Sequence, residues 1–170
     1  MGTAISLHCN KCGREKVIHF GTGFLFQQTY SQTIKDMKQG AYGELGQRFF
    51  AEHPQGTVDC EQVALVCGNC NRLVNGVDMT MYIPKPSQTT DDGQDADEDI
   101  PNWKENTFVM PSEIKQHFIE YAKFNHECHK CHSLMTVMKQ KLFEDRLNKC
   151  LVKCPECGEP MEQTEILDCE

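Results

Sequence analysis

The segment Cys9-Asn10-Lys11-Cys12-Gly13 introduces the motif that decides the fold. A Cys-x-x-Cys turn brings two sulfur atoms to one point, and the metal takes both as thiolates. Three more pairs have the same spacing: Cys67 and Cys70, Cys128 and Cys131, and Cys154 and Cys157. Two turns together supply four thiolates, the ligand set of a structural zinc site. The sequence therefore predicts two four-cysteine sites and two zinc ions per chain.

The residue that follows each pair supports this prediction. Gly13, Asn71, His132 and Gly158 occupy these positions. A tight turn of this kind needs a left-handed backbone there, which glycine adopts without steric cost and in which asparagine and histidine are enriched. All four turns therefore carry a residue that permits the required conformation.

An acidic segment divides the chain. Residues 87–106 carry one basic and seven acidic side chains, and Ser87–Asp99 contains one alanine and no other apolar residue. Such a segment buries too little apolar surface to offset the entropy of ordering. We therefore expect three parts: a first ribbon with an insertion over residues 1–86, a flexible acidic linker over 87–106, and a second ribbon over 107–170.

The linker also suggests how the cysteines pair. We expect one site to take both of its pairs from the first region, and the other site to take both from the second. The expected sets are Cys9, Cys12, Cys67 and Cys70, and Cys128, Cys131, Cys154 and Cys157. A site that takes ligands from both regions remains the alternative.

Residue patterns between the pairs predict a small α+β fold. Alternating or apolar runs predict strands near 16–20, 63–66, 77–83, 134–138 and 162–167. Helical spacing and end signals predict helices over 28–39, 43–52 and 112–124, and a helix or long loop over 139–149. The expected architecture is two rubredoxin-like zinc ribbons, which are short β hairpins, and the first contains the helical insertion.

Composition narrows the cellular setting. The chain has 170 residues, eleven cysteines and a net charge of -8. It shows neither an apolar run long enough for a membrane span nor a signal peptide at its start, so we expect a cytoplasmic protein with reduced thiols and no membrane partner. Without a basic block, the charge also disfavours nucleic acid as a partner.

Some chemistry stays open at this level. Iron binds the same four thiolates, so it is the alternative metal. The cysteines outside the pairs, Cys60, Cys150 and Cys169, are expected to be ordinary thiols, although Cys150 lies close to Cys154 and could compete as a ligand. The histidines His126, His129 and His132 are expected to be surface residues, with a second metal or an acid–base role as the alternative.

The cysteine motifs also resemble a known group of proteins. Cys9-x-x-Cys12-Gly13, the stretch Gly21-x-Gly23-Phe24-Leu25-Phe26, the helical insertion and the Cys-Pro-x-Cys-Gly at 154–158 are similar to a family of uncharacterised bacterial zinc-ribbon proteins. The resemblance covers most of the chain outside the acidic linker. It implies fold and metal but no activity. Asn71 and His132 depart from the glycine usual after the turn.

Three functions follow as hypotheses. Four thiolates leave no open position on the metal, and the sequence contains no phosphate loop or nucleophile elbow, so we expect no catalytic residues. The first hypothesis is a non-enzymatic adaptor that binds another protein. The second is a nucleic-acid-binding or transcription-related module, with Phe24, Phe26, Phe49 and Phe50 as candidate stacking residues, although we expect these aromatic residues in the core. The third is a metal or redox sensor.

Overall fold

The computed structural model describes residues 2–86 and 108–169, and the predicted linker over 87–106 lies outside these residues. The described chain is mixed α+β, with antiparallel sheets. Two compact units are present. Met1–Phe26, Cys60–Asp78 and Phe124–Glu170 form the first, and Gln27–Asp59 with Met79–Lys123 form the second. Each unit thus combines segments from both sides of the linker, unlike the expected division at 1–86 and 107–170.

The first unit contains a six-stranded sheet whose two halves have the same topology. One half, which we call the terminal ribbon, comprises β1 (Gly2–His8), β2 (Glu15–Gly21) and β9 (Glu162–Cys169), in the order β2-β1-β9. The other, the central ribbon, comprises β4 (Gln62–Cys67), β5 (Leu73–Val77) and β8 (Met135–Met138), and β4 pairs with both β5 and β8. In both, a hairpin's first strand pairs with a strand from much later in the chain.

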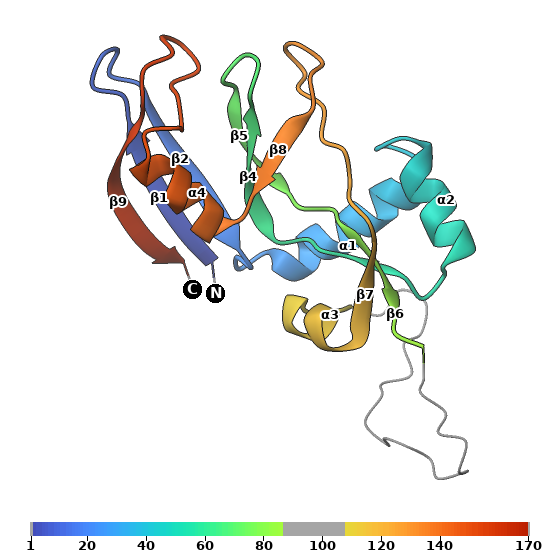
Figure 1. Ribbon diagram of the computed structural model, residues 1–170. Coiled ribbons are helices and arrows are strands. Elements are labelled where there is room, and N and C mark those ends of the chain that lie inside the picture. Colours follow the sequence, from blue (N-terminus) through green and yellow to red (C-terminus); the bar gives the residue numbers. More distant parts are fainter. Residues whose placement is uncertain (1, 87–107, 170) are drawn as a thin grey trace. The chain divides into compact units, whose positions relative to one another are not determined.

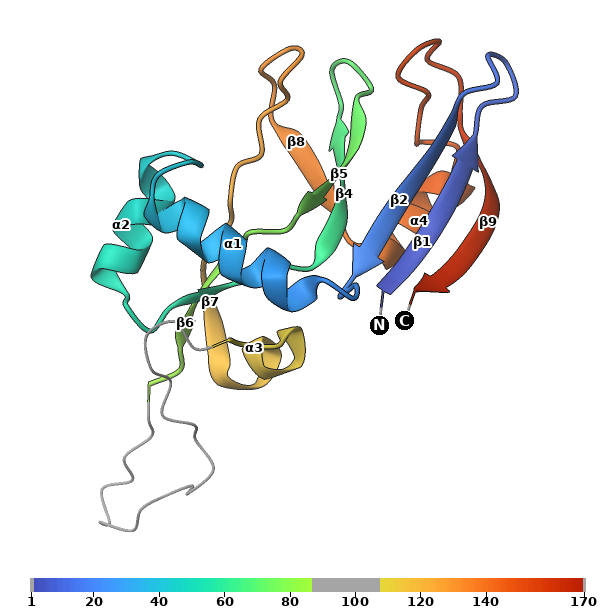
Figure 2. The same cartoon turned by 180° about the vertical axis from the view of Figure 1, so that it is seen from behind.

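The terminal ribbon therefore encloses the central ribbon in sequence. Its hairpin precedes the central ribbon, and β9 follows it, pairing antiparallel along β1 from Gly2↔Cys169 to His8↔Glu162. Figure 1 and Figure 2 show the N- and C-terminal strands side by side, and the loops of the four cysteine pairs at one end of this unit. β1 was not expected from the sequence, because its pattern is mixed rather than strictly alternating.

The two ribbons share one hydrophobic core. Ile5, Ile18 and Phe20 of the terminal ribbon cluster with Ala64, Leu73 and Met138 of the central ribbon. Helix α4 (Gln140–Asn148) completes this core with Phe143 and Leu147, and the Phe143 ring lies 5.2 Å from that of Phe20. Because these residues are buried against one another, we expect the two ribbons to fold together rather than as independent modules.

One backbone pair and one side chain also join the ribbons. The pair Gly21↔Gln62 connects β2 to β4. The Asn75 side chain accepts a hydrogen bond from the backbone N–H of His19 and donates one to the His19 carbonyl, both at 2.8 Å. The two hydrogen bonds of this side chain therefore link β5 to β2, which are not neighbours in the strand order.

The described residues of the second unit form a small sheet and three helices. The sheet has the order β3 (Thr57–Val58), β6 (Met81–Pro84) and β7 (Phe118–Ala122). Helices α1 (Phe26–Lys38) and α2 (Glu44–Glu52) lie close to the predicted ranges, and α3 (Pro111–His117) precedes β7. Gly46 permits a close helix contact, because a Cβ there would lie 3.0 Å from the Cβ of Met37.

Three local predictions were wrong. The helix expected over 112–124 ends at His117, because Phe118–Ala122 pairs with β6 as a strand. The strand expected over 77–83 is interrupted at Met79, whose φ is 64°. Phe24, expected in the core, is 90% exposed, whereas Phe26 is buried.

Candidate metal centres

All four cysteine pairs lie in loops of one geometry. The N–H of each first cysteine donates to the carbonyl five residues later, at 2.7–2.9 Å: Cys9 to Arg14, Cys67 to Arg72, Cys128 to Ser133 and Cys154 to Glu159. Each loop lies between two paired residues: His8↔Glu15, Val66↔Leu73, Glu127↔Leu134 and Lys153↔Pro160. The first two loops therefore project their sulfurs from strand ladders, and the last two project theirs from isolated β-bridges.

The residue after each pair has the predicted left-handed backbone. The φ angles are 73° at Gly13, 56° at Asn71, 58° at His132 and 76° at Gly158. The prediction made from these four residues is confirmed. Asparagine and histidine tolerate this region better than most side chains, so the two departures from glycine keep the turn.

The eight predicted ligands form two clusters, but not the expected ones. Cys9 and Cys12 meet Cys154 and Cys157, and Cys67 and Cys70 meet Cys128 and Cys131. The expected pairing within each region was wrong. Its physical reason is the strand order: β9 follows Cys157 and pairs with β1, while β8 follows Cys131 and pairs with β4. The linker marks a boundary in composition, and the strands determine which cysteines meet.

Both clusters fit a tetrahedral metal. The Sγ atoms of Cys9 and Cys157 are 3.4 Å apart, and those of Cys12 and Cys154 are 3.6 Å apart. The central cluster repeats these values for Cys67 with Cys131 and Cys70 with Cys128. A tetrahedron with metal–sulfur bonds of about 2.3 Å has sulfur–sulfur edges of about 3.8 Å. All four sulfurs of each cluster lie within 4.8 Å of one another, so small shifts of the side chains accommodate the ion. These residues would hold one ion in each cluster.

The surroundings of the sulfurs favour thiolate in part of each cluster. The backbone N–H of Cys12 donates to Cys9, and despite the opposing effect of burial it lowers the pKa of Cys9 to about 6. In the central cluster, hydrogen bonds from the Ser133 backbone and side chain lower the pKa of Cys131 to about 6. A metal ion takes cysteine as thiolate, so these donors assist binding.

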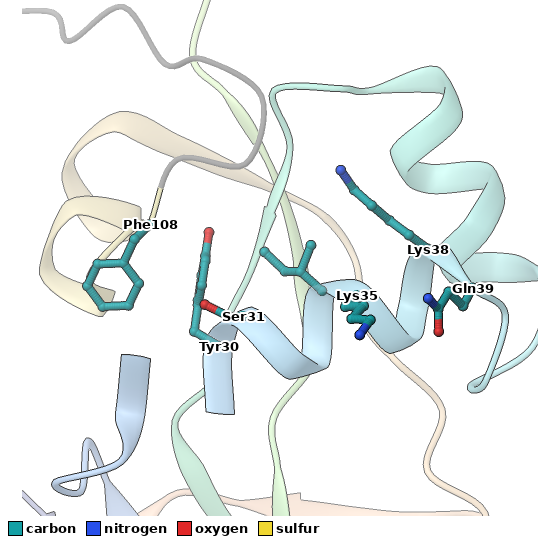
Figure 3. A pocket seen from close by; sticks show the side chains of 7 residues that line it. Tyr30, Ser31, Lys35, Lys38, Gln39 and Phe108 are labelled. Carbon is teal, nitrogen blue, oxygen red and sulfur yellow. The ribbon is translucent and has the colours of Figure 1, made fainter. Parts of the chain in front are cut away.

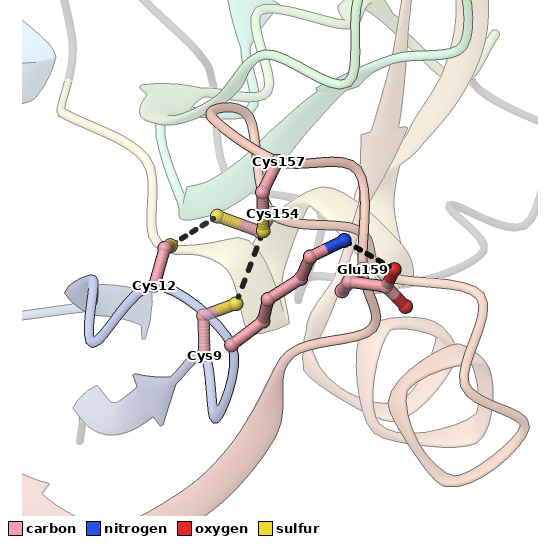
Figure 4. Close-up of polar contacts among 6 residues, drawn as sticks. Cys9, Cys12, Cys154, Cys157 and Glu159 are labelled. Carbon is pink, nitrogen blue, oxygen red and sulfur yellow. Dashed lines mark hydrogen bonds and ion pairs between the residues drawn. The ribbon is translucent and has the colours of Figure 1, made fainter.

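Two ion pairs cross the terminal cluster. Lys11 Nζ lies 2.9 Å from Glu159 Oε1, and Arg14 Nη1 lies 2.5 Å from Glu156 Oε1. Figure 4 shows the first contact beside the four sulfurs. We number each loop from its first cysteine. Lys11 at position three pairs with Glu159 at position six of the other loop, and Arg14 at position six pairs with Glu156 at position three.

Sequence reasoning missed these ion pairs, although a signal was present. The first loop has basic residues at positions three and six, and the last loop has glutamates at the same positions. The central loops have Asn69 and Arg72, and Lys130 and Ser133, so that arrangement would place Arg72 opposite Lys130. Only the first and last loops are complementary in charge.

The other candidate ligands do not join the clusters. His126, which was expected at the surface, is buried, and its Nε2 lies 2.9 Å from the Asp78 carbonyl oxygen. His132 Nδ1 lies 3.1 Å from Glu127 Oε1. Neither residue, nor His129, belongs to a group of metal-ligating side chains within the described part of the chain. The three histidines therefore do not form a second type of metal site there.

The cysteines outside the pairs differ from one another. Cys60 is buried, and Cys150 is exposed with φ 57°. Cys150 is not among the sulfurs of the terminal cluster, so it does not replace Cys154 as a ligand. Cys169 belongs to β9, and its side chain lies outside the described atoms.

We compared the chain with known proteins and found no relative. No protein-family profile, curated protein or solved structure matches the chain. Among the described residues, no helix combines the length and the apolar character needed to cross a membrane. The metal centres therefore have to be interpreted from their own geometry.

Proposed function

We propose that this protein is a non-enzymatic adaptor whose two four-cysteine sites hold structural zinc. The observation that carries the proposal is the closed ligand set in each cluster. A catalytic zinc site usually keeps one position for water or substrate, and four thiolates fill a tetrahedral shell. Thiolates favour zinc or iron over magnesium and calcium. We take zinc as the resident metal and a reducing, cytoplasmic setting for its thiolates.

The outer edge of the terminal ribbon supports the binding of a protein partner. β9 ends the strand order, and every side chain over 162–168 is exposed. Ile166 and Leu167 are 46% and 47% exposed. The strand also carries Glu162, Glu165 and Asp168, and no lysine or arginine. An edge of this composition suits a partner strand that is apolar and basic, added by β-augmentation.

Two observations favour a protein partner over nucleic acid. Lys11 and Arg14, the basic side chains of the first loop, are engaged by glutamates. Three of the four aromatic residues considered for base stacking, Phe26, Phe49 and Phe50, are buried. The net charge of -8 also gives little attraction to phosphate, on which non-specific affinity depends.

The metal assignment is tested by native mass spectrometry with elemental analysis. The proposal expects two zinc ions per chain and no further retained cofactor. Iron at either site, or a single metal, would contradict it. Zinc at both sites would leave the adaptor role to a separate experiment.

The adaptor role is tested at β9. Partners are captured from cell extract with the wild-type chain and with Ile166→Lys/Leu167→Lys, which adds charge to the edge. Leu142→Lys, at a residue of α4 that is 45% exposed, is the matched control. A captured protein is then purified and its affinity measured at several salt concentrations. The proposal expects saturable binding that the control keeps and the edge variant weakens by at least tenfold. Equal binding by all three chains would contradict it.

A further inference from the structure

A pocket of about 370 Å³ opens beside α1 in the second unit, away from the cysteine pairs in sequence. Figure 3 shows the side chains that line it. They are Tyr30, Ser31, Ile34, Lys35, Lys38, Gln39 and Phe108. The volume falls at the lower end of the range found for small-molecule sites. Neither the metal centres nor the proposed adaptor role uses this pocket.

One face of a helix supplies most of the pocket. Tyr30, Ile34 and Lys38 follow at intervals of four residues, as do Ser31, Lys35 and Gln39, so they form two adjacent rows along α1 and the residue after it. Tyr30 and Ile34 are buried and provide an apolar floor. The face is apolar near its start and cationic near its end.

Two aromatic rings form the apolar end. Phe108, in the segment before α3, lies edge-to-face with Tyr30 at 5.0 Å between ring centroids. The Tyr30 hydroxyl is 2.7 Å from Thr57 Oγ1, and this hydrogen bond fixes the ring. An aromatic ligand that contacts these rings at their edges or in an offset stack gains more than its apolar area alone provides.

Two lysines form the polar end. Lys35 is exposed, and Lys38 lies over the Phe50 ring with its Nζ 5.1 Å from the centroid. That contact restrains the long Lys38 side chain at the rim. None of the seven described lining residues is acidic. The positive charges of Lys35 and Lys38 suit an anion at the rim, and the apolar floor suits a flat apolar group.

We propose that this pocket binds a small aromatic carboxylate. The ring of the ligand would contact Tyr30, Ile34 and Phe108, and its carboxylate would lie at Lys35 and Lys38. This inference goes beyond the adaptor function and does not depend on it, since the pocket and the metal centres belong to different units.

Indole-3-acetate and its neutral analogue indole-3-acetamide test the proposal as probes. Each is titrated into the zinc-loaded full chain, and backbone amide shifts are followed by NMR. For a ligand of this size we expect saturable binding by the acid with a Kd on the order of 1 mM, with shifts in α1 and at Phe108. The amide carries no charge to pair with either lysine, so it is expected to bind more weakly, by about 2- to 5-fold per lysine.

Variants assign the contacts. Lys35→Gln and Lys38→Gln should each weaken binding of the acid by about 2- to 5-fold and leave binding of the amide unchanged, whereas Lys38→Arg should retain binding. Phe108→Ala should weaken binding of both probes. Lys115→Gln, at an exposed position of α3 outside the lining, is the control. Circular dichroism confirms that each variant is folded. The absence of saturable shifts, or equal affinity for acid and amide, would overturn the proposal.

Discussion

The terminal and central ribbons share topology and loop geometry, yet they differ in what brings their cysteines together. The terminal cluster joins Cys12 to Cys154 across 142 positions, whereas the central cluster joins Cys70 to Cys128 across 58. In the loop-entropy model the longer closure costs about 0.8 kcal/mol more. The terminal cluster also has two ion pairs between its loops, and the central loops have no complementary charges at those positions. The two loops that are further apart in the sequence are thus the ones with complementary charges.

Cysteine substitutions should give the largest effects and separate the ribbons by metal count. Cys9→Ser and Cys154→Ser should each remove the same ion, so their double variant keeps one zinc. Cys9→Ser with Cys67→Ser should release both. Structural zinc contributes about 10–16 kcal/mol in zinc-finger peptides, so removal of either ion should lower the melting temperature strongly. Native mass spectrometry at saturating zinc counts the ions.

The stability of the same variants provides an independent check. Residues that bind one ion act as a unit, so the Cys9/Cys154 double variant should be little less stable than either single variant. Additive losses in that pair, together with non-additive losses in Cys9/Cys67, would support pairing within each region instead.

Phe143→Ala should weaken both ribbons through their shared core. The side chain is fully buried and packs against Phe20, so its removal should cost about 3–5 kcal/mol. Leu142→Ala, at the adjacent exposed position, is the control. Chemical denaturation gives the free energies of unfolding, and chelator-induced release should accelerate for both ions. Accelerated release of one ion alone would show that the ribbons are independent.

Removing the contact that Asn75 makes between the ribbons should have an intermediate effect on stability. Asn75→Ala removes two hydrogen bonds to the His19 backbone, at a cost of about 1–3 kcal/mol. Hydrogen exchange at the His19 amide should accelerate. Asn75→Asp retains the acceptor for that amide and is expected to retain more protection than alanine. Unchanged exchange in Asn75→Ala would show that the side chain does not join the strands.

The smallest effects are expected at the exposed ion pairs. Lys11→Glu should reduce stability only slightly, because the pair is exposed, and Lys11→Glu with Glu159→Lys should recover most of the loss. The reduction should shrink as salt concentration rises. In the central ribbon, Lys130→Glu should be neutral or slightly stabilising, because it faces Arg72 in the corresponding arrangement. Equal reductions in both ribbons would show that loop charge does not distinguish them.

Local chemistry in the chain was predictable, and its long-range pairing was not. The Cys-x-x-Cys spacing and the permissive residues Gly13, Asn71, His132 and Gly158 led to the eight clustered cysteines and their turns, since these depend on nearby backbone. Helix α1 followed from its helical pattern, and strand β4 followed from its short apolar run. The partner of each loop depends on whether β9 pairs with β1, which is a contact between the ends of the sequence. Lys11 and Glu159 carried information about it in their charges.

The same distinction explains the misassigned segment after α3. Ile114, Phe118 and Tyr121 fit a helical face, but Phe118–Ala122 is a strand because β6 provides a pairing edge. Tertiary context overrode a short periodic pattern. The acidic segment misled the domain assignment for a related reason: a run of acidic residues in the sequence carries no information about which flanking strands associate.

The nested pairing of the two metal sites is tested most directly by NMR of the cadmium-113 form. Each cadmium ion couples through bonds to the β protons of its own four cysteines, so the spectrum assigns ligands ion by ion. We predict one ion coupled to Cys9, Cys12, Cys154 and Cys157, and the other to Cys67, Cys70, Cys128 and Cys131. Couplings from one ion to Cys9, Cys12, Cys67 and Cys70 would contradict the account.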